Sequence, residues 1–160
     1  MAGEPRSVTI YPQSIVVNIS PMAFHGWSEQ YLAAARAVPS RQGFSPVPYY
    51  LHGLAMELAL KAFLLAKGIS RTTLANRKLG HNLHALLTES EQRGLQQYSP
   101  ITAAHRFHLS LLNDYYASRA LEYFDLEKAL KGFSGLPDLA LVGAFLDALL
   151  ASIEAICHSA

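Results

Sequence analysis

Residues 49–68 read YYLHGLAMELALKAFLLAKG, and this stretch decides the fold of the chain. At the helical step of about 100° per residue, its apolar side chains point in nearly every direction, which is typical of a helix buried on all sides. Only Glu57 and Lys61 interrupt the apolar pattern at its centre, four residues apart and with the acid first, the order that favours a helical ion pair. We therefore expect a central helix from about Pro46 to Lys67, with Gly68 in the left-handed closing position.

Serine–proline pairs mark the expected starts of three helices. A serine can accept a hydrogen bond from a first-turn amide, and the proline after it lacks the amide that would remain unpaired. Such pairs occur at Ser20-Pro21, Ser45-Pro46 and Ser99-Pro100. Together with apolar periodicity and Pro or Gly breaks, they predict helices over Pro21 to Val38, Pro46 to Lys67, His81 or Asn82 to Gly94, Pro100 to as far as Ala120, and from Pro137 onward, with a loop from Ile69 to Gly80.

The first twenty residues have a different pattern. Two short β-branched runs, 8–11 and 15–19, lie on either side of Pro12, which favours an extended arm or a hairpin. No internal repeat or low-complexity segment follows. The sequence therefore predicts an extended arm over residues 1–20 and, over residues 21–160, one all-α bundle of about five helices.

The composition is unusually apolar and nearly neutral. Of the 160 residues, 51% are hydrophobic and 16% are charged, whereas soluble domains average about 25% charged residues. The net charge of +1 argues against a strongly basic nucleic-acid binder. Because a five-helix monomer can cover only part of so much apolar surface, we expect a homodimer whose interface consists of apolar helix faces.

The cellular setting follows from the single cysteine and from the chain's start. Cys157 has no partner for an intrachain disulfide, and residues 1–6 lack the basic-then-apolar order of a signal peptide. The apolar stretch 54–66 is short and carries two charges, so it does not fit a membrane span. We expect a cytoplasmic protein that does not associate with a membrane.

Positive charge is concentrated in one segment, residues 58–88. Residues 58–88 contain no acid, and the rest of the chain compensates for their five basic residues, which are Lys61, Lys67, Arg71, Arg77 and Lys78. This segment could hold phosphate, particularly beside the amides at the next helix start, or it could be a solvated basic loop. Glu57 and Lys61 could likewise be a structural pair, or could line a cleft or a subunit interface.

Motifs for metal, cofactor or nucleophilic chemistry are weak. His81/His84 and His105/His108 have helical metal-ligand spacing, but no further ligand pattern accompanies them. No phosphate-loop, dinucleotide or nucleophile-elbow motif occurs, and Cys157 on an apolar helix fits packing better than catalysis. We therefore expect no metal and no cofactor.

Three segments carry a resemblance to a known family. The Glu-Leu-Ala-Leu-Lys run of residues 57–61, the Gly-His-Asn-Leu start at 80–83, and the segment 112–119 with Glu122-Tyr123-Phe124 occur in that order. In this the chain resembles the HEPN-like helical proteins, the higher eukaryotes and prokaryotes nucleotide-binding family. The resemblance covers roughly residues 21–157.

That resemblance implies a helical bundle, usually a homodimer, with nucleotide- or RNA-associated function. Many such proteins are metal-independent ribonucleases of toxin–antitoxin or defence systems, which carry Arg, four to six residues, then His. Arg77 and His84 match that spacing, and Arg could stabilise phosphorane charge while His transfers a proton. The pair lies beside the Gly-His start instead of in a well-formed polar motif, so a module without nuclease activity is the leading hypothesis.

Three functions thus stay open. The first is a nucleotide- or RNA-binding module, the second an endoribonuclease using Arg77 and His84, and the third a partner protein of a two-gene system. For the binding module, Glu57 would orient Lys61. The expected ligand-binding residues are Glu57, Lys61, Arg71, Lys78, His81, Tyr116 and Arg119.

Overall fold

The computed structural model describes residues 17–39, 44–76, 78–121 and 135–160, and every regular element within them is helical. The predicted all-α bundle is confirmed. In chain order the elements are α1 (Pro21–Ala37), α2 (Pro46–Ala66), α3 (Arg71–Leu74), α4 (Leu83–Gln92), the 3-10 helix η1 (Leu95–Gln97), α5 (Ala103–Tyr116) and α7 (Leu139–Ser159).

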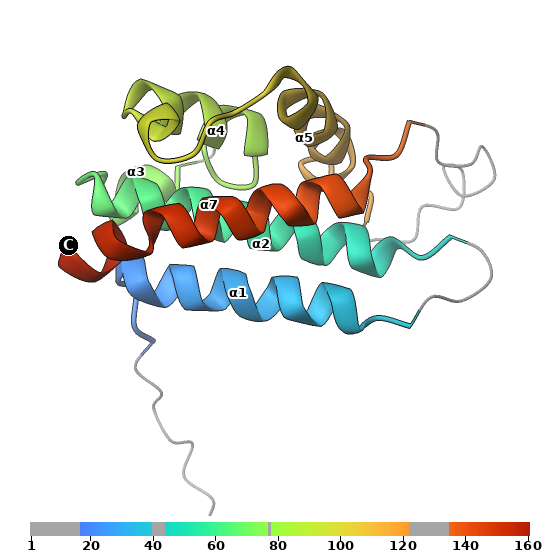
Figure 1. Ribbon diagram of the computed structural model, residues 1–160, viewed down its shortest axis with the longest axis horizontal. Coiled ribbons are helices and arrows are strands. Elements are labelled where there is room, and N and C mark those ends of the chain that lie inside the picture. The colour runs from blue at the N-terminus through green and yellow to red at the C-terminus, as the bar shows by residue number, and fades with distance from the viewer. Residues whose placement is uncertain (1–16, 40–43, 77, 122–134) are drawn as a thin grey trace, which may run out of the picture.

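Helix α2 is the centre of the bundle, as its apolar sequence predicts. Helices α1 and α7 run along it, and α4 and α5 pack against its other side (Figure 1). Its side chains Met56, Leu60, Phe63 and Leu64 are fully buried. Helix α2 therefore contacts at least four other helices.

Several predicted helix ends are confirmed at the level of hydrogen bonds. The Ser20 hydroxyl accepts from the Ala23 amide at the start of α1, and the Asn82 side chain accepts from Ala85 at the start of α4. Gly68 follows α2 with φ +82°, the left-handed conformation that glycine adopts without steric cost. Ser45 precedes Pro46 as predicted but makes no side-chain capping bond.

The predicted start at Ser99-Pro100 is wrong. Helix α5 begins at Ala103, and its cap is Thr102, whose hydroxyl accepts from the His105 amide while the His105 ring accepts from the Thr102 amide. This reciprocal pair satisfies two amides at once, which a serine–proline pair cannot do. The helix also ends at Tyr116 and not near Ala120, since Arg119 takes a left-handed φ of +56°.

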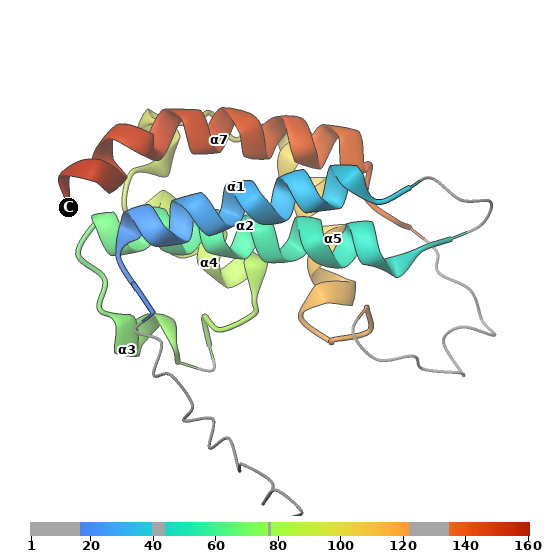
Figure 2. The same ribbon diagram turned by 90° about the horizontal axis from the view of Figure 1, so that it is seen from below.

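The loop predicted over 69–80 contains a short helix that the sequence pattern missed. Helix α3 is a single turn, capped by Ser70, whose hydroxyl accepts from the Thr73 amide. One turn gives no apolar periodicity, so the pattern could not reveal it. Figure 2 shows α3 set off from the three long helices. Of the extended arm predicted for 1–20, only residues 17–20 are described, and they are not helical.

Helix α7 is long and apolar enough, by length and composition, to cross a membrane, with a mean hydropathy of 2.0. In the structure it packs against α1, α2 and α5, as a core helix of a bundle does. Asp147 and Glu154 lie on its exposed side. Its buried side chains include Val142, Phe145, Leu146, Leu149, Leu150, Ile153 and Cys157.

Candidate functional site

The carboxylate of Glu57 lies buried at the centre of the molecule with three donors around it. Lys61 Nζ lies 2.5 Å from Oε1, while His81 Nδ1 and the Tyr116 hydroxyl lie 2.9 Å and 2.6 Å from Oε2. These four residues, which we call the Glu57 cluster, were all expected at the site. The structure therefore brings together side chains from α2, from the turn before α4, and from α5.

Burial explains why Glu57 needs so many partners. Its side chain is 4% exposed, and that of Lys61 is 12% exposed. A buried carboxylate persists only when it is paired and hydrogen-bonded, since desolvation costs several kcal/mol. Glu57 thus has the partners that its burial requires, and its bond to Lys61 also fixes the Lys61 ammonium in place. An ammonium has three N–H donors, so the bond to Glu57 leaves two for another group.

A close approach between α2 and α5 positions Tyr116. A Cβ on Gly53 would lie 2.5 Å from Tyr116 Cδ2 and 2.8 Å from Cγ, closer than real contacts allow. Only glycine lets the tyrosine ring pass this near to α2 and reach Glu57 one turn further along. The Tyr116 ring also packs 6.0 Å from that of Tyr50.

Gly53→Ala should therefore destabilise the fold although alanine is the better helix former. Helix propensity favours alanine by about 1 kcal/mol, but overpacking costs about 1–3 kcal/mol, so we expect a net loss of up to about 2 kcal/mol in urea unfolding. Gly26→Ala in α1 is the matched control, because a Cβ there meets nothing within 4 Å. That variant should gain roughly 0.5–1 kcal/mol. Equal gains for both variants would contradict the close approach.

Lys61 also lines a cavity beside the Glu57 cluster. Its volume is about 280 Å³, and it lies between α2, α3 and the start of α1. Its surface is almost wholly apolar, so its two cationic residues, Lys61 and Arg71, line it mainly with the carbon stems of their side chains, and no carboxylate lines it in the described part of the chain. The other walls are apolar and consist of Ile19, Phe24, Leu65, Leu74 and Ala75. We call this the Lys61–Arg71 cavity.

The remaining expected site residues lie elsewhere. Lys78 is exposed before α4, and Arg119 is exposed in the turn after α5. His84 is on α4 and lines a separate groove with Arg106 and Phe107 from α5. Arg77 lies outside the described residues, so the spatial relation of the proposed catalytic pair is not defined.

Two first-turn amides of α4, where the sequence suggested an anion, already have acceptors. Leu83 N donates to the Asn113 side chain at 2.8 Å, and Ala85 N donates to Asn82 at 3.0 Å. The first bond joins α4 to α5. These two amides are therefore not free to bind an anion.

The two histidines of α5 and the cysteine have structural surroundings. The His105 ring stacks on Phe145, and His108 Nδ1 accepts from the Asp138 amide at the start of α7. Burial raises the pKa of the Cys157 thiol to about 11, so it stays protonated at neutral pH. This fits the packing role expected for that residue.

No protein-family model, no curated protein and no solved structure matches the chain. The sequence indicated the cationic residues of the cavity but not its apolar walls. Phe24 and Leu74 come from separate helices, and no spacing rule connects them to Lys61.

Proposed function

We propose that this chain is a HEPN-like binding module for a phosphate-bearing ligand of the nucleotide or RNA class, without nuclease activity. The observation that carries the proposal is the Lys61–Arg71 cavity, which has two cationic side chains among apolar walls and no lining carboxylate in the described part of the chain. Cations suit a phosphate, and an apolar surface suits a base and the carbon face of a ribose.

Each cation has a distinct role in this proposal. The Lys61 ammonium is fixed by Glu57 and acts as an anchored point charge with donors to spare. Arg71, on α3, offers a planar fork that can bind two phosphate oxygens together. Phe24 supplies the aromatic wall against which a base could pack. His81 takes part through Glu57, to which it donates.

The size of the cavity limits the ligand. Small-molecule sites occupy about 300–1,000 Å³, and the volume of this cavity, about 280 Å³, is just below that range. It therefore suits one nucleotide unit, either free or as part of a strand. A strand would continue along the surface, where Lys78 is exposed before α4.

No described contact favours the endoribonuclease. That function needs Arg77 beside His84, and Arg77 lies outside the described residues. The protein-partner function and the homodimer remain predictions. A chain that dimerises but binds neither nucleotide nor RNA would favour the partner function.

Arg71→Ala should weaken nucleotide binding by at least tenfold, because a charge-assisted phosphate contact is worth about 1.5–3 kcal/mol. The measurement is a titration of the full chain with ATP and with a short single-stranded RNA, at two salt concentrations and with a chelator present. Arg93→Ala is the matched control, since Arg93 pairs with Glu89 on α4 away from the cavity.

The affinities for the two ligands measure binding, and the length of the RNA after incubation measures cleavage. Weaker binding of both ligands by the Arg71 variant, with intact RNA, supports the proposal. RNA cleavage that His84→Ala abolishes would replace it with the nuclease function. Equal affinity in the Arg71 and Arg93 variants, or no affinity for either ligand, would overturn it.

A further inference from the structure

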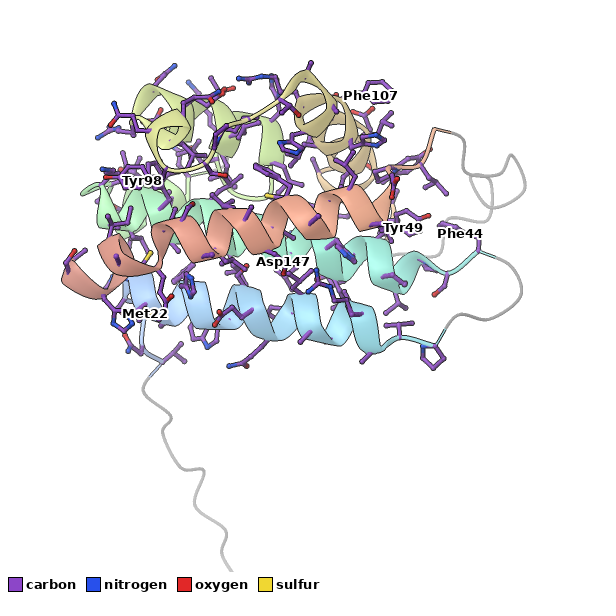
Figure 3. The ribbon with its side chains drawn as sticks, viewed as in Figure 1. Met22, Phe44, Tyr49, Tyr98, Phe107 and Asp147 are labelled. Carbon is purple, nitrogen blue, oxygen red and sulfur yellow. The ribbon has the colours of Figure 1, made fainter. Side chains whose placement is uncertain are left out.

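A second polar site lies on the other side of the bundle, between α1 and α7. A cleft of about 330 Å³ opens there, which we call the α1–α7 cleft. Arg36 and Asp147 form a bidentate ion pair across it, and Figure 3 shows Asp147 on the side of α7 that faces α1. The other lining residues are His25, Glu29, Leu32, Ala33, Leu150, Ala151 and Glu154.

The acidic side chains of this cleft outnumber its basic ones among the described residues. Among the described residues that line the cleft, Arg36 is the single arginine or lysine, and Asp147 already neutralises it. Glu29 and Glu154 remain, both with well-exposed side chains, and Glu154 Oε1 lies 4.0 Å from the His158 ring nitrogen Nε2. The cleft therefore has an excess of negative charge away from the Arg36–Asp147 pair.

His25 adds a buried acceptor to these carboxylates. Its side chain is 2% exposed, and its Nε2 lies 3.0 Å from the Leu150 carbonyl. Because a carbonyl can only accept, Nε2 carries the proton, and in the neutral ring Nδ1 keeps its lone pair. Among the described residues, Nδ1 is a buried side-chain nitrogen without a hydrogen-bond partner.

The position of that lone pair indicates the kind of group it would take. Glu29 Oε2 lies 3.7 Å from His25 Nδ1, too far for a direct hydrogen bond. One nitrogen donor can stand about 2.9 Å from both atoms at once. A primary ammonium has three N–H donors and a positive charge, so it would satisfy His25 and also neutralise a carboxylate.

We propose that the α1–α7 cleft binds a primary aliphatic ammonium group, held by His25 Nδ1 and Glu29 with Glu154 nearby. The carbon chain of the amine would lie on Leu32, Ala33 and Ala151. The ammonium group could belong to a free small amine or to a lysine side chain of another protein. The site shares no lining residue with the Lys61–Arg71 cavity, so the two proposals stand or fall separately.

The test is an NMR titration of the full chain, labelled with 15N in its histidine rings. The probes are 1,4-diaminobutane, Nα-acetyl-lysine amide and, as the neutral match, 1-butanol. The amines should shift the Nδ1 resonance of His25, and 1-butanol should not. Glu29→Gln, an exposed substitution that should leave the fold intact, should weaken amine binding at least tenfold, whereas Glu89→Gln on α4 should not change it.

The pattern of shifts decides between the outcomes. A response to both amines indicates that a protein lysine can enter, and a response to the diamine alone indicates a free small amine. The proposal is overturned if 1-butanol acts like the amines, if Glu29→Gln has no effect, or if millimolar amine leaves His25 unchanged, because a buried water would then account for Nδ1.

Discussion

Glu57→Ala is expected to lower the free energy of unfolding by about 3–5 kcal/mol, the usual result of removing one partner from a buried ion pair. The substitution leaves the Lys61 ammonium, with its side chain 12% exposed, without its carboxylate. It also removes the carboxylate that accepts a hydrogen bond from the buried Tyr116 hydroxyl. Chemical denaturation followed by circular dichroism measures the loss, in a protein whose total stability should be about 5–15 kcal/mol.

A matched pair on α4 provides the control. Glu89 and Arg93 have the same four-residue spacing but are more exposed, so Glu89→Ala should cost no more than about 0.5 kcal/mol. Lys61→Met should recover part of the Glu57→Ala loss, with a coupling energy of at least about 1 kcal/mol. A Glu57→Ala loss no larger than that of Glu89→Ala would show that the Glu57 cluster does not form.

Phe63→Ala is expected to cost about 3–5 kcal/mol, as large-to-small changes of buried aromatic residues do. Phe63 is fully buried on α2, and its ring meets that of Tyr98 edge to face at 5.7 Å. The side chain of Lys67 lies over both rings, so the cavity left by alanine would also loosen this C-terminal end of α2. Urea unfolding measures the change.

The control for Phe63 is an aromatic residue at the surface. Phe107 is 61% exposed, and Phe107→Ala should change stability by no more than about 0.5 kcal/mol. Similar small losses for both variants would mean that α2 is not buried on all sides.

The sequence predicted the parts of the fold that depend on local signals. The all-round apolar pattern of α2 predicted its central place, and Ser20, Gly68 and Asn82 marked helix ends because their effects are confined to one turn. The start at Ser99-Pro100 was wrong because Thr102 offers a two-way cap with His105. Since the structure is of a single chain, the homodimer stays a prediction.

Prediction of the site was best where charge interrupted an apolar pattern. Glu57 and Lys61 stood out for that reason, whereas the contacts of His81 and Tyr116 with the Glu57 carboxylate are long-range and appear only in the structure. Phe24 could not be assigned to the site, because its place in the cavity wall depends on how α1 crosses α2 and α3. The unpaired Nδ1 of His25 likewise arises only from tertiary packing.

The most direct test of the proposed function is a crystal structure of the chain with a bound mononucleotide. We predict a phosphate oxygen about 2.7–3.0 Å from Lys61 Nζ and a second contact from Arg71, with the base or ribose against the apolar walls of the Lys61–Arg71 cavity. A nucleotide bound elsewhere, or a cavity that stays empty at saturating nucleotide, would contradict it.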